Sequence, residues 1–418
     1  MNDAAKPPAK PAVSPLAPAR TPDLAPVAGV RLAAAACGIR YQGRDDLMLA
    51  ELAPGSTIAG VLTRSLTAGA PVAWCRRNLP GGRVRGIVVN SGNSNTFTGA
   101  KGEAVVEATA REAARLLGCA PSEIFISSTG VIGEPPAGER ILAGLPRAQA
   151  ALAAENWPAA ARAIMTTDTF PKLATARAAI GGTTVTINGF AKGSGMIAPD
   201  MATMLAYVFT DARIAAPVLQ SLLSAGADRS FNCITVDGDT STSDTVLLCA
   251  TGAAQHEPVT RASDAQLRAF RKALDAVLID LAQQIVRDGE GAEKFVTIEV
   301  TGAASARAAR RIGLAIGNSP LVKTALAAGD ANWGRIVMAV GKAGEKADRD
   351  RLVIAVGGTR ICEKGGPVPS YDEAPVARHM AGRDIHIAVD LGIGRGRATV
   401  WTCDLTHRYI DINGSYRS

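Results

Sequence analysis

The sequence predicts a mixed α/β fold, and three observations lead to this prediction. Strand-like apolar runs occupy residues 57–62, 72–74 and 84–89 in the first half of the chain. Stretches with helical periodicity alternate with such runs, which is typical of α/β architecture. The chain is also large and apolar enough for about two or three domain-sized units, with 418 residues of which 47% are hydrophobic and 20% charged.

The N-terminal segment differs from the rest of the chain in composition. Residues 1–28 are rich in proline and alanine, and they lack the apolar stretch of a secretory signal. We therefore expect a disordered extension there. No run of about 18 apolar residues occurs later, so a membrane span is not expected.

The first helix with a clear apolar face is expected over residues 101–119. Its apolar positions follow a 4-3-4 spacing that lines one side of a helix: Val106, Ala110, Ala113 and Leu117. Gly118 is placed to end this helix, because glycine readily takes the left-handed conformation of a helix C-terminus.

A hairpin and a loop precede the most unusual boundary of the sequence. A Gly-Gly pair separates strand candidates at 173–180 and 183–187, as a tight hairpin turn would. Residues 189–203 then form a loop punctuated by glycine and proline, and the apolar run 204–209 is expected to be a strand. The hydroxyl of Thr203 thus lies where a loop meets a buried strand.

The clearest helix is expected over residues 263–286. Ser263 and Gln266 have the spacing of a capping box at its start, and Asp288 and Gly289 follow its end. A buried stripe is expected from the spacing of its apolar residues: Leu267, Phe270, Leu274, Leu278, Leu281 and Ile285.

Charge and cysteine usage narrow the classes of partner. The net charge of +7 is spread thinly and only 4% of residues are aromatic, so nucleic-acid binding is not expected. The seven cysteines form no Cys-x-x-Cys pair or dense framework, which favours free thiols in a reducing compartment such as the cytoplasm. No zinc-binding pattern is present, and we expect no metal.

Few ordinary catalysts are available. None of the four histidines belongs to a recognisable Ser/His/Asp or Cys/His arrangement, and the glycine before Lys192 stands at the wrong spacing for a phosphate loop. A different nucleophile is the hydroxyl of Thr203, activated by its own α-amine once the peptide bond from Ala202 is cut. An α-amine with a pKa of about 7.7 to 8.0 is partly free base near neutral pH. From the residues alone, a plain turn and a structural threonine are the commoner interpretations of such a segment, and spacing does not decide between them and this nucleophile.

A family resemblance extends this hypothesis. Residues 192–207 read KGSGMIAPDMATMLAY and resemble the self-cleavage signature of the ornithine acetyltransferase family, which are glutamate N-acetyltransferases of arginine biosynthesis. Further segments resemble the same family: NSGNSN at 90–95, SSTGVIG at 127–133, MTTDTFPK at 165–172, SFNCITVDGD at 230–239, DGEGA at 288–292, GDANWGR at 329–335 and YIDINGSYRS at 409–418.

The resemblance implies self-cleavage between Ala202 and Thr203. It divides the chain, after the tail, into an α chain of residues 29–202 and a β chain of residues 203–418, with Thr203 as the nucleophile. It also implies that the developing oxyanion is stabilised by two neighbouring residues, Thr129 and Gly130.

The resemblance further assigns six substrate contacts: Thr166, Lys192, Thr203, Glu290, Asn413 and Ser418. Lys192 would meet a carboxylate of an amino-acid substrate and Glu290 an ammonium group. Without the resemblance, Lys192 reads as an exposed loop lysine and Glu290 as a solvated acid at a helix end. Asn413 and Ser418 lie at a terminus, where fraying is the default.

The implied activity is a ping-pong acetyl transfer from N2-acetyl-L-ornithine to L-glutamate. Some family members also accept acetyl-CoA, so this donor belongs to the expectation, and no cofactor is implied. The implied structure is an αββα sandwich with additional α/β domains, assembled as an α2β2 heterotetramer in the cytoplasm. An N-terminal-nucleophile aminopeptidase or amidase of the same superfamily is the alternative enzyme. A non-catalytic amino-acid-binding protein that never cleaves is the alternative outside the enzymes.

Overall fold

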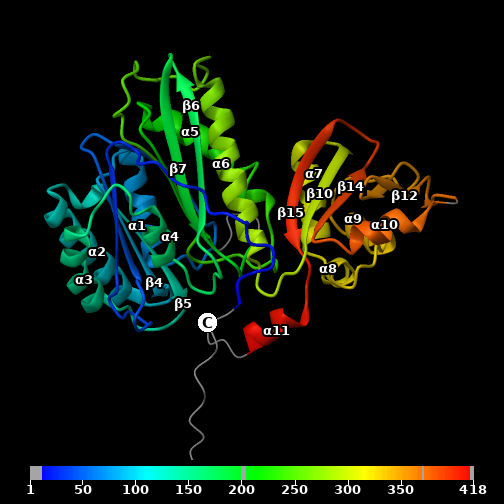
Figure 1. Cartoon of the computed structure of the whole chain (residues 1–418), viewed down its shortest axis with the longest axis horizontal. Helices are drawn as coiled ribbons and strands as arrows, with labels where there is room; N and C mark the ends of the chain where they lie inside the picture. The colour runs from blue at the N-terminus through cyan, green and yellow to red at the C-terminus, as the bar shows by residue number, and fades with distance from the viewer. Residues whose placement is uncertain (1–11, 199–203, 370, 415–418) are drawn as a thin grey trace, which may run out of the picture.

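The computed structural model describes residues 12–198, 204–369 and 371–414. Within these ranges the chain forms sheets of four, five and six strands, with helices packed against them (Figure 1). The predicted mixed α/β class is confirmed. In the same ranges no helix combines the length and apolarity that a bilayer crossing needs, and all seven cysteines are free thiols.

The four-stranded sheet has the order β1-β2-β4-β5. Its strands are β1 (Val30–Ala35), β2 (Leu47–Leu52), β4 (Gly86–Asn93) and β5 (Ile124–Val131). Only the pairing of β4 with β5 is parallel. Helices α2 (Gly99–Leu117) and α3 (Gly138–Ala150) pack on its outer face, and α1 (Ala70–Asn78) lies against β5.

The five-stranded sheet has the order β3-β9-β8-β7-β6. Its strands are β3 (Thr57–Leu62), β9 (Thr245–Ala250), β8 (Leu205–Thr210), β7 (Thr183–Lys192) and β6 (Lys172–Ile180). Helices α5 (Ala216–Ala227) and α6 (Leu267–Arg287) cover its outer face. The hairpin predicted around the Gly-Gly pair is confirmed as β6 and β7.

The inner faces of these two sheets pack on each other. Phe125 of the first sheet shares a core with Phe190 and Phe209 of the second. Trp157, from helix α4 (Trp157–Ala163), fills the space with its ring centroid 5.6 Å from that of Phe209. The layer sequence is helix, sheet, sheet, helix, so the expected αββα sandwich is confirmed.

A second α/β unit follows the sandwich, with sheet order β13-β12-β11-β14-β10-β15. Its strands are β10 (Phe295–Ala303), β11 (Val353–Val356), β12 (Thr359–Glu363), β13 (Gly366–Pro367), β14 (Asp384–Asp390) and β15 (Gly396–Cys403). Its helices are α7 (Ala306–Gly317), α8 (Pro320–Ala327), α9 (Trp333–Gly341) and α10 (Glu373–Met380). A final helix, α11 (His407–Gly414), leaves this unit (Figure 1).

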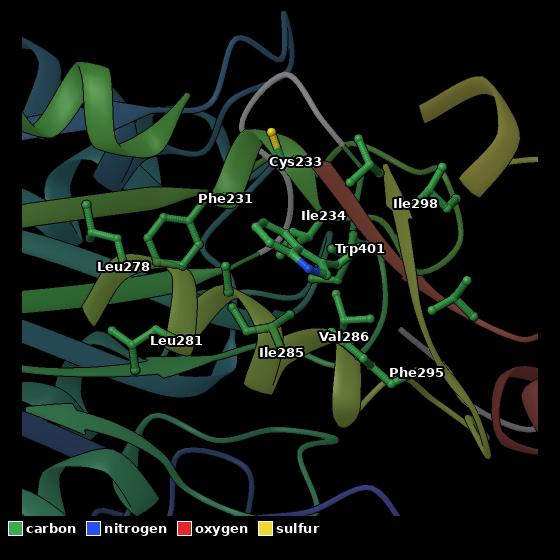
Figure 2. Packing of buried hydrophobic residues seen from close by; sticks show 14 of the residues in the cluster. Phe231, Cys233, Ile234, Leu278, Leu281, Ile285, Val286, Phe295, Ile298 and Trp401 are labelled. Carbon is green, nitrogen blue, oxygen red and sulfur yellow. The ribbon is translucent and has the colours of Figure 1, made fainter. Parts of the chain in front are cut away.

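Helix α6 joins the core of the sandwich to that of the second unit. Figure 2 shows Leu281 and Ile285 of this helix in one apolar cluster with Ile234, Trp401 and Phe295. The two units therefore share a continuous hydrophobic core.

Two local predictions are wrong. Residues 72–74 lie in helix α1 rather than in a strand, and the buried Val72 and Cys75 show the spacing of a helix face. A short apolar run cannot distinguish the two states. The capping box at Ser263 does not form, because α6 begins at Leu267, and the side chain of its N-cap residue, Gln266, accepts no capping hydrogen bond.

The N-terminal extension is ordered from residue 12 onward, which corrects the expectation of disorder for residues 12–28. The backbone N–H of Ser14 donates to Thr169 Oγ1 at 2.9 Å, and its hydroxyl donates to the Arg287 carbonyl at 2.6 Å. Leu16 is only 5% exposed and belongs to the core around α6. The sequence did not predict these contacts, because the proline-rich segment shows no regular spacing of apolar residues.

Replacing Leu16 with alanine should lower the free energy of unfolding by about 2 kcal/mol, the lower end for a buried Leu-to-Ala change, because a segment at the edge can relax. Val13 is 60% exposed, so Val13→Ala is the matched control and should change little. Urea unfolding measures both variants. Equal stabilities would show that the segment does not stabilise the fold.

Candidate active site

The alternation of β7 brings Lys192 to the first sheet. Phe190 points into the space between the two sheets, and Lys192, two residues on, points the same way. Its ammonium donates a hydrogen bond to Thr129 Oγ1 in β5 at 3.3 Å. Both residues are 4% exposed, so Lys192 is not the exposed loop lysine that its neighbours suggest. Burial lowers the pKa of Lys192, although the Asp168 carboxylate opposes this shift.

Gly130 occupies a position that only glycine fits. Its φ of +132° is rarely adopted by other residues. A Cβ atom there would lie 2.4 Å from the carbonyl carbon of Gly92 in the neighbouring strand. The strand pairing also shifts register between Gly92 and Asn93. The backbone that carries Thr129 and Gly130 is therefore held close against β4.

Glu290 contacts the loop that follows Lys192 and contains Ser194 and Gly195. Its N–H donates to the Ser194 carbonyl at 2.9 Å. A Cβ on Gly195 would lie 2.5 Å from Glu290 Oε2, so the glycine lets the carboxylate rest on the loop. Asn413 Nδ2 donates to the same oxygen at 2.8 Å. Burial raises the pKa of Glu290, with hydrogen bonds from Asn413 and Thr167 opposing the shift.

The position of Asn413 shows that the C-terminal segment returns to the site. Thr406 donates from its hydroxyl to the Gly291 carbonyl at 2.7 Å, and Tyr409 OH donates to Asp237 Oδ2 at 3.3 Å. Helix α11 thus begins beside the loop that carries Glu290. The default expectation of a frayed end does not hold for residues up to Gly414.

Asp168 connects Thr166 to the rest of the site. One carboxylate oxygen accepts the N–H of Thr166 at 3.0 Å. The other accepts the N–H of Gly193 at 2.6 Å and the ammonium of Lys172 at 2.7 Å. The structure therefore brings together Thr129, Gly130, Thr166, Lys192, Glu290 and Asn413 through short contacts around one loop.

Sequence reasoning missed the buried ion cluster under this loop. Lys172 is 0% exposed and bridges Asp168 at 2.7 Å and Asp288 at 2.6 Å. Burial disfavours the ionised form of Asp168, but the charges of Lys172 and Lys192 outweigh it, and its pKa lies below the usual range. The signal in the sequence was the position of Asp168 and Lys172 in one family motif and of Asp288 in another.

The junction between Ala202 and Thr203 lies outside the described residues, as does Ser418. Both sides of it are anchored by carboxylates. The N–H groups of Met196 and Ile197 donate to Asp237 at 2.6 and 2.8 Å. After the junction, the N–H of Met204 donates to Asp244 Oδ1 at 2.8 Å. Burial raises the pKa of Asp244 well above its usual value.

Comparison with known proteins identifies the family. The model of the ArgJ family matches residues 31–418. The chain belongs to this family. It is 60% identical, over 406 residues, to the arginine biosynthesis bifunctional protein ArgJ of Gluconobacter oxydans (strain 621H), covering 97% of this chain and 96% of that protein.

Two solved structures are similar to part of the chain. Arginine biosynthesis bifunctional protein ArgJ from Bacillus halodurans is 41% identical, covers 50% of this chain and 98% of its own, and has a TM-score of 0.49. Ornithine acetyltransferase from Mycobacterium tuberculosis, complexed with ornithine, is 34% identical, covers 41% of this chain and 92% of its own, and has a TM-score of 0.37. The family predicted from the motifs is confirmed by the family match and the Gluconobacter relative.

Replacing Lys172 with methionine should destabilise the protein by about 3–5 kcal/mol, because two buried carboxylates lose their only shared counter-ion among the described residues. Lys101 is exposed on α2, so Lys101→Met removes the same charge and should cost less than about 0.5 kcal/mol. Chemical denaturation compares the two. Similar values would mean that the cluster contributes nothing specific to stability.

Proposed function

We propose that the protein is a glutamate N-acetyltransferase of arginine biosynthesis, which moves the acetyl group of N2-acetyl-L-ornithine to L-glutamate. The observation that carries this proposal is the convergence of Lys192 and Glu290 on the loop that leads to Thr203. The buried cation of Lys192 and the partly buried carboxylate of Glu290 suit the carboxylate and ammonium groups of amino acids. Family membership supports the same activity.

The first proposed step is self-cleavage between Ala202 and Thr203. The hydroxyl oxygen of Thr203 attacks the Ala202 carbonyl, the peptide C–N bond breaks, and an ester links the two residues. Water then hydrolyses the ester and leaves a free α-amine on Thr203. Support comes from the carboxylates of Asp237 and Asp244, which anchor the chain on the two sides of the junction. The products are the α chain, ending at 202, and the β chain, residues 203–418.

The second step is acetyl transfer through Thr203. Its α-amine accepts the hydroxyl proton while the oxygen attacks the acetyl carbonyl, and ornithine leaves with that proton when the amide C–N bond breaks. The amine of glutamate then attacks the acetyl ester and restores the hydroxyl. The oxyanion is stabilised by Thr129 and Gly130. An ammonium group can only donate hydrogen bonds, so in its contact with Lys192 the Thr129 oxygen is the acceptor. The hydroxyl hydrogen of Thr129 therefore stays available for the oxyanion.

Substrate recognition follows from the same side chains. Lys192 binds a substrate carboxylate and Glu290 a substrate ammonium, while Thr166, Asn413 and Ser418 complete the contacts. A bound ammonium group would favour the ionised form of Glu290, whose pKa is raised by burial in the free protein.

The reaction exchanges one amide for another, so we propose that it uses neither a metal nor a cofactor. Acetyl-CoA is proposed as a second acetyl donor, which would also make N-acetylglutamate. We further propose that the cleaved chains assemble as an α2β2 heterotetramer in the cytoplasm.

Replacing Thr203 with alanine should abolish both chain cleavage and acetyl transfer, because the nucleophile is lost. Thr203→Ser is the matched control, since it keeps a hydroxyl and should retain cleavage. Intact-mass analysis and an assay of N-acetylglutamate measure the two activities. A Thr203→Ala variant that still uses acetylornithine would place the nucleophile elsewhere, and release of acetate instead of N-acetylglutamate by the wild type would indicate an amidase.

The binding of glutamate should weaken as pH rises through the pKa of Lys192, which burial places below the ordinary value of 10.5. The charged form exists below that pKa, so KM for glutamate should rise on the alkaline side. Lys192→Arg keeps its charge to higher pH and should flatten this rise even if kcat falls. Identical alkaline limbs in both proteins would assign the titration to another group.

A further inference from the structure

A strongly basic cavity shares none of its lining residues with the proposed substrate contacts. It has a volume of about 790 Å³ and lies between helix α7, the loop that contains Ala198 and the start of the segment after α9. Five cationic side chains line it: Arg64, Arg307, Arg310, Arg311 and Lys342. Asp228 is the one acidic residue among its described lining.

The helical repeat of α7 produces this concentration of charge. Arg307, Arg310 and Arg311 stand at i, i+3 and i+4, so they share one face of the helix. The opposite face, which includes Ile312 and Ile316, is buried. Packing of the apolar face therefore leaves all three arginines on the outer side of the helix, where they line the cavity.

The positive charge is only partly neutralised. Arg310 pairs with Asp228 at 2.9 Å, and Arg311 pairs with Glu345 at 3.0 Å. Arg307 and Lys342 form no ion pair with any residue that the structure describes. At least two cations of the cavity are thus available to an incoming anion.

The carboxyl of Asp228 responds to this positive field. Burial disfavours its ionised form, yet hydrogen bonds from Asn232 and Arg310 and the charges of Arg310 and Arg64 lower its pKa. A position that stabilises one anion in this way is suited to others.

The cavity is close to the acyl site along the chain. Ala198 lines the cavity, and Gly195 rests on the carboxylate of Glu290. Three residues of backbone span at most about 11 Å. The Thr235 hydroxyl connects the two places, because it donates to the Ile197 carbonyl at 3.0 Å and also contacts Asn318 in the cavity wall.

We propose that this cavity binds the phosphate groups of an acyl donor, and that the donor is acetyl-CoA. CoA carries a pyrophosphate and a 3′-phosphate, so it brings more negative charge than the carboxylates of glutamate or acetylornithine to a cavity in which Arg307 and Lys342 form no ion pair with a described residue. The inference rests on the proposed function. Transfer from this donor forms the Thr203 Oγ–acetyl bond and breaks the C–S bond, and the thiolate takes the hydroxyl proton from the α-amine.

The direct test is calorimetric binding of CoA to the purified full chain. The double variant Arg307→Gln with Lys342→Gln should bind CoA about tenfold or more weakly, because it loses two charge-assisted contacts. Arg268→Gln with Lys272→Gln removes the same charge from exposed positions on α6 and is the matched control. An unchanged affinity in the cavity variant would overturn the proposal.

Probes of related chemistry identify the source of the phosphate. Dephospho-CoA, which lacks the 3′-phosphate, should bind more weakly than CoA, and ATP more weakly still. ATP or pyrophosphate binding as tightly as CoA, and weakening in the same variant, would overturn the assignment to acetyl-CoA and leave a general phosphate site. Absence of binding by every probe would overturn the site itself.

Activity assays with acetyl-CoA and with acetylornithine test the cavity site and the proposed function separately. The cavity variant should show a raised KM for acetyl-CoA and unchanged transfer from acetylornithine. A wild type that uses acetylornithine but never acetyl-CoA would reject the donor and keep the proposed function. Failure with both donors, together with intact CoA binding that the variant weakens, would reject the proposed function and keep the phosphate site.

Discussion

The site depends on one buried ion pair cluster, in which Lys172 lies between Asp168 and Asp288. The three residues come from the start of β6, the loop before it and the end of α6. All three side chains are fully buried, so solvent screens their attraction little and an unpaired charge among them would be costly. Since Asp168 also holds the N–H groups of Thr166 and Gly193, the cluster sets the position of the loop.

The same cluster explains why the N-terminal segment docks. Asp288 accepts the N–H of Thr169 at 2.9 Å and its hydroxyl, and the Thr169 hydroxyl oxygen in turn accepts the N–H of Ser14. A chain of hydrogen bonds thus runs from the buried Asp288 through Thr169 to Ser14 in the N-terminal segment. Each layer satisfies the polar groups of the one beneath it, as buried polar atoms require.

Periodicity predicted much of the fold. The apolar stripe of α2 and the glycine at its end, the hairpin of β6 and β7, and strand β8 all follow from local pattern. The helix at 70–78 did not, because three apolar residues are too few to show a period. The site was beyond such patterns, since Lys192 and Thr129 stand 63 residues apart and meet only through sheet packing. Family motifs named these residues, but only the fold explains their proximity.

The strand order of the five-stranded sheet has a consequence for a chain that is cut between β7 and β8. Strands β3, β7 and β6 precede such a cut, while β9 and β8 follow it, and β8 pairs with β7 as β9 pairs with β3. The two polypeptides would be interleaved within a single hydrogen-bonded ladder. Neither polypeptide could dissociate without breaking the backbone hydrogen bonds that join β8 to β7 and β9 to β3. A cut would therefore let the new chain ends move locally while the two polypeptides stayed bound in one sheet.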